Sequence, residues 1–204
     1  MIRPLTPDAV AEFERCIGRG GVAVFPADTV YGLACNPGSP SSIERMLGLK
    51  ERGEGRPSAV MFFQLERMLT AIDWLGERTA AALNRLLPGP VTVVVPNPEG
   101  RYALAGGSGL GLRVPRLEGT LEPLSAARVA VLQTSANPSG GSDARTVGDI
   151  VTEIVEGADI VLDGGELSGI PSTVIDLTRY EQDGSWELLR ETAVPRKHVA
   201  ELLT

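Results

Sequence analysis

The stretch Thr134-Ser135-Ala136-Asn137-Pro138-Ser139-Gly140 is the part of this sequence around which the fold can be reasoned outward. It follows the apolar run 129–132, which is short and partly β-branched, as expected of a buried strand. Ligands in open α/β sheets sit at the carboxyl ends of strands. Two interpretations stay open: Ser135 and Asn137 either contact a ligand, or they only stabilise a turn and the helix expected near Thr146.

The composition indicates one α/β domain with an aliphatic core, covering residues 1–204. Apolar residues make up 43% of the chain and aromatic residues only 4%. The net charge is −7 and the isoelectric point about 4.9. This acidic balance argues against a surface that binds nucleic acid throughout, although it leaves room for a local basic patch.

Scarce histidine and cysteine limit the chemistry that this chain can perform. His198 is the single histidine, so neither a His-based catalytic triad nor a His-ligated zinc site is expected, and we predict no metal-binding residues. Cys16 and Cys35 are expected to be reduced thiols. No apolar run approaches the roughly 20 residues that cross a bilayer, and no signal-peptide pattern opens the chain. We therefore expect a cytoplasmic protein that does not use a membrane.

Hydrophobic periodicity predicts an irregular alternation of strands and helices. The expected strands cover residues 22–25, 59–63, 91–95, 111–115, 129–132, 159–162, 172–177 and 186–190. The expected helices cover residues 6–17, 39–49, two segments within 65–87, and 121–128, 147–155 and 195–203. Residues 28–33 are expected to form a polar and aromatic turn. Because some strands are only a turn apart, the sheet should be mixed rather than purely parallel.

Cationic residues at three places in the sequence could contact a ligand. The segment Lys50-Glu51-Arg52-Gly53-Glu54-Gly55-Arg56-Pro57 combines cations with glycines beside an expected strand. Such a loop suits phosphate binding, since Arg offers a planar fork and Lys a point charge, but a solvated loop could have the same composition. It is not a P-loop, because no G-x-x-x-x-G-K-[ST] occurs. Arg113 and Arg190 lie in expected strands. Each is expected either to form an ion pair or to contact a ligand.

Taken together, seven stretches resemble the signature motifs of the YrdC family. They are FPADTVYGL at 25–33 ("PTDTVYGL"), KER at 50–52 (K-x-R), PGPVT at 88–92 ("PGPLT"), RVP at 113–115 (R-x-P), SANPSG at 135–140 ("SANxSG"), STVIDLT at 172–178 ("STVVDLT"), and LR at 189–190. They occur in the family's order and span nearly the whole chain. Each stretch alone is a weak signal, but seven in sequence are hard to reach by chance.

This resemblance implies a fold and an activity. The implied fold is a twisted mixed β-sheet flanked by helices, with a central, positively charged concave cavity. The implied activity is synthesis of L-threonylcarbamoyl-adenylate from L-threonine, bicarbonate and ATP, with Mg²⁺ carried by ATP and pyrophosphate released. The product serves threonylcarbamoylation of the tRNA adenosine beside the anticodon, so tRNA and tRNA-modification proteins are the further expected partners.

The same resemblance assigns roles to individual residues. The expected nucleotide contacts are Lys50, Arg52, Arg113, Ser135, Asn137 and Arg190, and Lys50 and Arg52 are also the expected catalytic residues. Ser172 would help to hold the threonine. Thr29 and Tyr31 are expected on the threonine side of the cavity, although an aromatic residue after a strand can equally serve packing.

Five positions depart from the family pattern: Ala27, Gly53, Met61, Asp143 and Pro171. The family's usual residues there are Thr, Pro, His, Ser and Glu, respectively. Most of these departures fall on the expected amino-acid side of the site. They keep open a divergent paralogue that acts on another carbamate or carbamoyl substrate. A second alternative is an RNA-binding module that uses the same basic cavity without chemistry, against which the net charge weighs.

Overall fold

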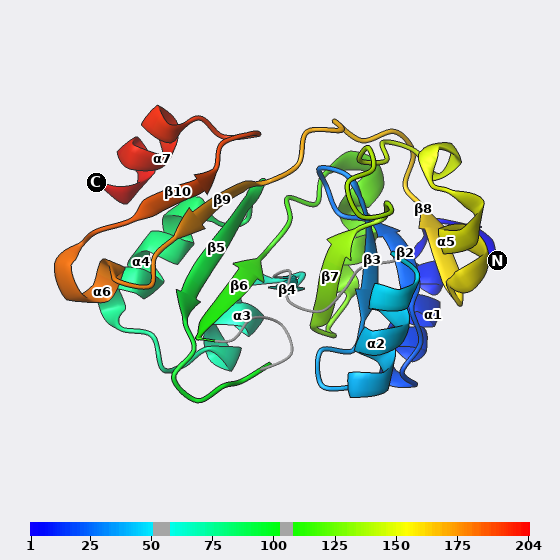
Figure 1. The fold of residues 1–204 in the computed structure, drawn as a ribbon, viewed down its shortest axis with the longest axis horizontal. Helices are drawn as coiled ribbons and strands as arrows, with labels where there is room; N and C mark the ends of the chain where they lie inside the picture. Colours follow the sequence, from blue (N-terminus) through cyan, green and yellow to red (C-terminus); the bar gives the residue numbers. More distant parts are fainter. Residues whose placement is uncertain (51–57, 103–107) are drawn as a thin grey trace.

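The computed structural model describes residues 1–50, 58–102 and 108–204 as an α/β fold (Figure 1). The strands are β1 Ile2–Pro4, β2 Ala23–Pro26, β3 Tyr31–Cys35, β4 Ala59–Met61, β5 Val91–Pro96, β6 Gly109–Arg113, β7 Val131–Ser135, β8 Ile160–Asp163, β9 Thr173–Asp176 and β10 Glu187–Arg190. The α-helices are α1 Pro7–Gly18, α2 Pro40–Gly48, α3 Leu65–Ala71, α4 Glu77–Leu86, α5 Thr152–Gly157, α6 Tyr180–Asp183 and α7 Arg196–Leu203. Two 3₁₀ helices are η2 Gly119–Ala126 and η3 Val147–Asp149.

The first two helices begin where their capping residues predict. Thr6 accepts a hydrogen bond at Oγ1 from the backbone N–H of Ala9 (3.3 Å), and proline follows it at the first helical position of α1. Ser39 plays the same part before α2, where its hydroxyl accepts from Ser42 N (3.4 Å). Within the described ranges, no helix has the length and apolar character needed to cross a membrane.

In the described residues, ten strands form one sheet in the order β1-β8-β2-β3-β7-β4-β6-β5-β9-β10. Short β4 lies between two halves of this sheet, pairing parallel with β6 and antiparallel with β7. Figure 1 shows β2, β3, β7 and β8 in one half and β5, β6, β9 and β10 in the other, with the termini at opposite ends. Parallel and antiparallel pairs both occur, which confirms the predicted mixed sheet.

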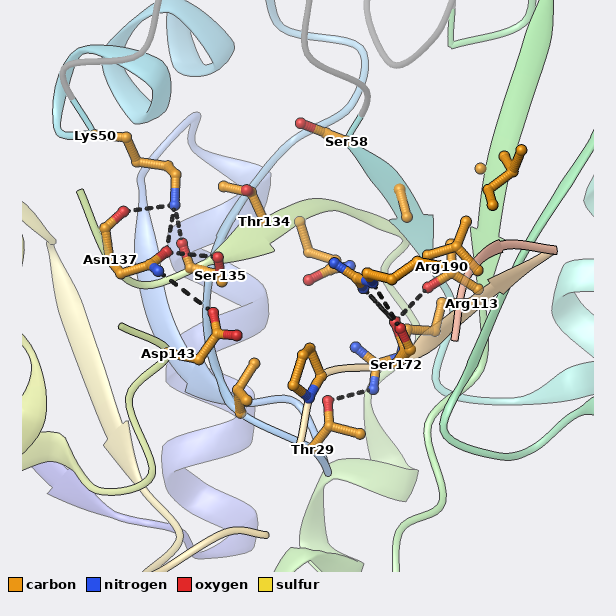
Figure 2. A pocket seen from close by; sticks show the side chains of 18 of the residues that line it. Thr29, Lys50, Ser58, Arg113, Thr134, Ser135, Asn137, Asp143, Ser172 and Arg190 are labelled. Carbon is orange, nitrogen blue, oxygen red and sulfur yellow. Dashed lines mark hydrogen bonds between the residues drawn. The ribbon is translucent and has the colours of Figure 1, made fainter. Parts of the chain in front are cut away.

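One face of the second half of the sheet borders a cavity between the two halves (Figure 2). Side chains alternate between the faces of a strand, so every second residue reaches the same side. The alternate residues that line the cavity are Thr92, Val94, Gly109, Gly111, Arg113 and Val174. The residues between them on these strands are apolar and buried. They point to the opposite face of the sheet, where they are part of the hydrophobic core.

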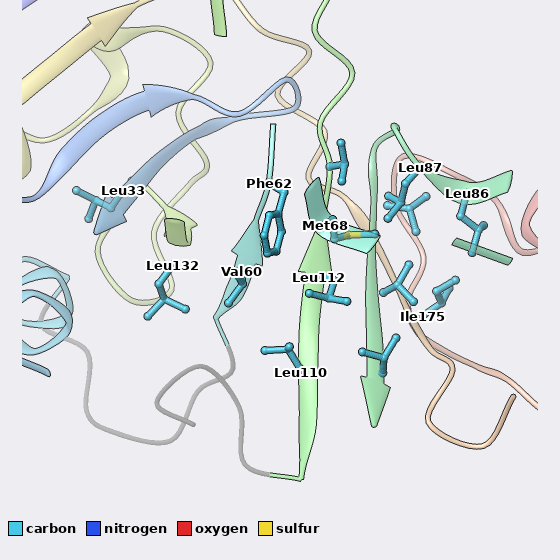
Figure 3. Packing of buried hydrophobic residues seen from close by; sticks show 14 of the residues in the cluster. Leu33, Val60, Phe62, Met68, Leu86, Leu87, Leu110, Leu112, Leu132 and Ile175 are labelled. Atoms are coloured by element: carbon cyan, nitrogen blue, oxygen red, sulfur yellow. The ribbon is translucent and has the colours of Figure 1, made fainter. Parts of the chain in front are cut away.

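Two clusters of buried side chains make up the core. The larger one packs β4, β6, β5 and β9 against helices α3 and α4, and Figure 3 shows Phe62, Met68 and Leu112 within it. The smaller cluster packs α1 against β2 and contains three aromatic rings, Phe13, Phe25 and Phe63. Their centroids lie 5.7–6.1 Å apart in tilted and edge-to-face arrangements, which suit aromatic pairs.

The prediction of a turn over residues 28–33 was wrong for its second half. Tyr31–Cys35 is strand β3, fully buried and paired antiparallel with β2 and β7. The actual turn is the short connection 27–30, in which Asp28 adopts a positive φ of 60°. Asp tolerates this left-handed conformation better than most residues, and the turn lets the chain fold straight back into a hairpin.

Two predicted helices also differ from the structure. The pattern over 147–155 is split into η3 and α5, because Asp149 caps its own short turn by accepting from Thr146 N (2.8 Å) and Arg145 N (3.0 Å). The segment predicted as helix over 121–128 is the 3₁₀ helix η2, which contains Pro123. The edge strand β1 and the single-turn helix α6 were not predicted.

The sheet's apolar face should be sensitive to the loss of volume. Leu112 on β6 is completely buried, so Leu112→Ala is expected to lower the free energy of unfolding by about 2–5 kcal/mol. Ile2 on the edge strand β1 is 52% exposed, and Ile2→Ala should change it by only about 0.5 kcal/mol. Urea denaturation measures both. Equal losses for the two variants would contradict this account of the core.

Both thiols should be slow to react in the folded protein. Burial raises the pKa of Cys16 to about 11 and that of Cys35 to about 12. The thiolate is the reactive form, so at pH 8 each should react with a disulfide reagent at least about 100-fold more slowly than free cysteine, and Cys35 more slowly than Cys16. In denaturant both should approach the rate of free cysteine. Fast labelling of either thiol in the native protein would show that it is not held as described.

Candidate active site

The cavity between the two halves of the sheet has a volume of about 460 Å³, and its described lining includes three cationic side chains among polar and apolar ones (Figure 2). This volume is in the range of small-molecule sites. Lys50 and the turn after β7 form one wall, and Arg113, Ser172 and Arg190 stand on the other. Thr29, from the β2–β3 turn, lies between the walls at one end. The cavity thus collects residues from distant parts of the chain.

Lys50 ties the end of helix α2 to the turn after β7. Its side chain is buried, and Nζ donates to the carbonyl oxygens of Asn137 (2.6 Å) and Ser135 and to Asn137 Oδ1 (3.0 Å). In return, the backbone N–H of Ser139 donates to the Lys50 carbonyl (3.1 Å). Lys50 is therefore not part of a solvated loop, and its charge is held at the cavity wall.

Ser135 and Asn137 organise this turn and do not cap the following helix. Ser135 Oγ donates to Asn137 Oδ1 (2.6 Å), and Asn137 Nδ2 donates to the carbonyl of Gly141 (2.6 Å) and to Asp143 Oδ1 (3.4 Å). The turn at Thr146 has its own cap, described above. The structure therefore bears out the turn half of the second interpretation and contradicts its helix-capping half, and contact with a ligand stays a prediction.

Arg113 is buried on β6, in the interior of the sheet. Its Nη2 donates to the carbonyl of Ala27 (3.0 Å), to Thr29 Oγ1 (2.7 Å) and to the Asp28 carboxylate. Burial lowers the pKa of Arg113 and raises that of Asp28, and in each case the partner's charge acts in the opposite direction. Arg113 is therefore an ion-pair partner and a cavity-lining residue at once.

Arg190 reaches the cavity from the edge strand β10. Its Nε and Nη2 both donate to the Ser172 carbonyl (3.0 and 2.7 Å), which orients the guanidinium. The Ser172 hydroxyl lies 2.8 Å from Thr92 Oγ1 and 3.3 Å from Arg190 Nη2. Partial burial lowers the pKa of Arg190, while the charge of Asp143 raises it. Hydroxyls and a guanidinium thus meet at this wall.

Of the predicted site residues that the structure describes, all but Tyr31 lie together at the cavity. Lys50, Arg113, Ser135, Asn137, Arg190, Thr29 and Ser172 all line the cavity. Arg52 lies outside the described residues, as does the departure at Gly53.

Of the two expectations for Tyr31, packing is the one observed, because its side chain points from the start of β3 into the buried core and is not among the residues that line the cavity. Its hydroxyl donates to the carbonyl of Gly165 (2.8 Å) and accepts from Gly164 N (3.0 Å). Burial raises the pKa of this phenol to about 12. Tyr31 therefore holds the loop after β8 rather than a ligand.

The departures from the family pattern separate into two groups. Ala27 and Met61 are buried in the smaller core cluster and are not among the residues that line the cavity. Asp143 and Pro171 do line it. Of the departures that the structure describes, these two are therefore the ones positioned to alter what the cavity binds.

Several cavity residues were given no role by the sequence: Ser58, Thr92, Gln133, Thr134 and Asp143. Thr92 could have been singled out, because it ends the PGPVT stretch that resembles a family motif. Thr134 opens the stretch quoted first and Asp143 is one of the departures, but neither position indicated a contact, and Ser58 and Gln133 carry no local signal. Their position became apparent only when β4, β7 and β9 met around one space.

This arrangement suits an anionic ligand with several oxygen atoms. Cationic groups stand on both walls, and hydroxyl and amide groups are among the other lining residues. Lysine and arginine form charge-assisted hydrogen bonds to phosphate and carboxylate oxygens, which are stronger than neutral ones. Across the described ranges, no group of three or more His, Cys, Asp or Glu residues could hold a metal ion.

The sequence of this chain matches one family model and is similar to several threonylcarbamoyl-AMP synthases. A model of the Sua5/YciO/YrdC family, described as telomere recombination, matches residues 15–192. A threonylcarbamoyl-AMP synthase from Hahella chejuensis is 34% identical over 164 residues, which cover 78% of this chain and 89% of the relative. One from Thiobacillus denitrificans is 31% identical over 167 residues, which cover 78% and 86%.

Solved structures of Sua5 and YciO have the same fold as this chain. Pyrococcus abyssi Sua5 in complex with L-threonine superposes with a TM-score of 0.83 at 24% identity, and Escherichia coli YciO with 0.79 at 22%. This chain spans 60% of that Sua5 chain and 96% of YciO. At these identities the likeness shows the fold, whereas the family model covers most of the sequence. The chain therefore belongs to the Sua5/YciO/YrdC family.

Proposed function

We propose that this protein is a threonylcarbamoyl-AMP synthase, which makes L-threonylcarbamoyl-adenylate from L-threonine, bicarbonate and ATP. One observation carries the proposal. The nucleotide contacts expected from the family motifs come from separate parts of the sequence, and those that the structure describes all line one cavity: Lys50, Arg113, Ser135, Asn137 and Arg190. The relatives with this name, which align over most of the chain, support it.

In this proposal the triphosphate lies between the two cationic walls. Lys50 provides a buried charge at the turn after β7, and Arg190 provides a guanidinium already oriented by the Ser172 carbonyl. Ser135 and Asn137 present polar groups beside Lys50. Arg52 remains a predicted phosphate contact from the sequence motif. Groups held in place before the ligand arrives need little reorganisation when charge develops in the transition state.

The amino acid would occupy the side of the cavity where Thr29, Thr92 and Ser172 present their hydroxyls. Two departures that questioned threonine, Ala27 and Met61, have side chains in the core. The L-threonine complex of Pyrococcus abyssi Sua5, a protein of the same fold, further supports threonine as substrate. Asp143 and Pro171 remain the residues through which a different amine could be selected.

The reaction needs positioning and charge neutralisation more than it needs a nucleophile from the protein. A carbamate oxygen of N-carboxy-threonine attacks the α-phosphorus of ATP, and the bond from that phosphorus to the bridging oxygen of pyrophosphate breaks. Lys50 and the arginines would stabilise the negative charge on the phosphate oxygens. No covalent enzyme intermediate is required, so the lack of a histidine in the described cavity does not hinder this mechanism.

Mg²⁺ would arrive with ATP as part of the substrate. Mg²⁺ is usually held by one or two carboxylates together with substrate phosphates. Asp143 is the carboxylate among the described cavity-lining residues, so the lining fits an ion carried mainly by ATP. Such an ion would help to neutralise the phosphates.

We further propose that the product is passed to tRNA by partner proteins in the cytoplasm. A mixed carbamate–phosphate anhydride is an activated group that must be consumed by transfer. Free thiols at Cys16 and Cys35 are consistent with a reducing compartment.

Pyrophosphate release tests this function directly. With ATP and Mg²⁺, release should require both L-threonine and bicarbonate, and L-serine should support it less well. Lys50→Ala should reduce kcat/KM about 100-fold or more, equivalent to about 3 kcal/mol, since a buried charge at the phosphates is lost. Exposed Lys197 on α7 provides the matched control, and Lys197→Ala should change kcat/KM less than about twofold.

Release that needs neither threonine nor bicarbonate would point to another adenylation chemistry. ATP binding without any release would leave the RNA-binding alternative or a different amine as substrate, and a screen of amines would separate them. Because Lys50 also holds the turn after β7, urea denaturation must show that Lys50→Ala is folded.

Asn137→Asp should weaken ATP binding. The new carboxylate oxygen would face the Gly141 carbonyl and Asp143 in place of the amide that donates to both, and it would add negative charge beside the phosphates. We expect an affinity for ATP at least about tenfold lower by calorimetry. Asn84→Asp makes the same change on the exposed side of α4 and should have no effect. Equal affinities for the two variants would remove Asn137 from the nucleotide site.

A further inference from the structure

Asp28 lies in the motif FPADTVYGL, but neither the sequence nor the proposed reaction gives it a role. It is at the tip of the β2–β3 turn with φ of 60°, and its side chain is only 7% exposed. One carboxylate oxygen accepts from Arg113 Nη2, and the other accepts from the backbone N–H of Arg116 (2.9 Å). Both the side chain at the end of β6 and the chain just beyond it are thus bound to one carboxylate.

This contact joins the two halves of the sheet. Asp28 belongs to the half that contains β2 and β3, whereas Arg113 belongs to β6 beyond β7 and β4 in the strand order. Ala27 and Thr29 add two more acceptors from the same turn to Arg113 Nη2. The cavity lies between these halves, so the contact fixes a cationic side chain at the border of both.

Arg113 has a buried donor without a hydrogen-bond partner in the described part of the protein. Its Nε is one of three buried side-chain polar atoms in the described residues that lack a hydrogen-bond partner. The other two, Gln64 Oε1 and Asn97 Oδ1, belong to residues outside the cavity lining. Leaving a buried donor unsatisfied is costly, so such an atom in a cavity-lining residue indicates a place for an acceptor from a ligand.

We propose that Asp28 is a positioning residue: it holds Arg113 by Nη2 so that Nε stays open for an oxyanion of a substrate. The ion pair also compensates the burial of the guanidinium, which would otherwise be expensive. Because the pair is neutral as a unit, Arg113 contributes a directed hydrogen bond more than net charge. This inference rests on the proposed function only in that the ligands are taken from it.

Asp159 provides a matched control for Asp28. It also accepts from an arginine, Arg45 Nη1 (2.7 Å), and from a backbone N–H, that of Val22 (2.8 Å). This second pair is exposed, and its residues are not among those that line the cavity. Comparing Asp28→Asn with Asp159→Asn therefore separates positioning of Arg113 from the general effect of losing an Asp–Arg pair.

Calorimetric titration with Mg-ATP and with L-threonine, each alone, tests the proposal. Asp28→Asn should weaken one of these anions at least about tenfold, while Asp159→Asn keeps both within about twofold. The affected ligand identifies the oxyanion, a phosphate or a carboxylate. Unchanged affinity for both ligands in folded Asp28→Asn, or equal losses in the two variants, would overturn the proposal.

A measurement on the unmodified protein covers the case in which Asp28→Asn does not fold. The Nε–H resonance of Arg113, assigned with Arg113→Lys, should shift in the nitrogen–proton NMR spectrum when the relevant anion is added. A purely structural arginine would not respond. A resonance unchanged at saturating levels of both ligands would overturn the proposal. The proposed function is judged separately, by threonine- and bicarbonate-dependent pyrophosphate release.

Discussion

The buried contact between Arg113 and the β2–β3 turn is the constraint on which the candidate site depends. Arg113 extends from the interior strand β6, and a charged side chain there is tolerated only with close partners. The turn 27–30 supplies a carboxylate, a carbonyl and a hydroxyl to the same Nη2 atom. The hairpin of one half of the sheet is thereby fixed to the other half, and the cavity between them acquires defined walls.

The alternation of side chains along the strands explains how one sheet carries both a core and a site. On β5 and β6, one face places Val93 and Leu112 in the larger cluster, and the other face places Thr92 and Arg113 in the cavity. The site therefore rests on strands that are buried on their far side. Because rigid elements hold these groups, their positions depend little on loop motion. Lys50 extends the same principle to the turn after β7, which it ties to α2.

Part of the site could be predicted from the sequence because its motifs are local. Ser135 and Asn137 stand two residues apart and meet through their own turn, so the motif almost specifies their contact. The position of Lys50 beside them, 87 residues from Asn137 along the chain, came from the family resemblance and not from any local pattern. Tyr31 was placed on the wrong side because the β2–β3 turn is shorter than expected, and this brings Tyr31 into a strand.

The sequence by itself determined most of the longer elements and their type, since these follow from near neighbours, but it missed β1 and α6 and took the start of β3 for a turn. Capping residues such as Thr6 and Ser39 start helices, and β-branched runs such as 91–95 form strands. Only the tertiary structure decided which face of each strand meets the cavity and which distant groups pair. A shift of one residue in register would exchange the two faces of a strand, and local propensity does not set that register. The pairing of Arg113 with Asp28 depends on this register, because it needs Arg113 on the cavity face of β6.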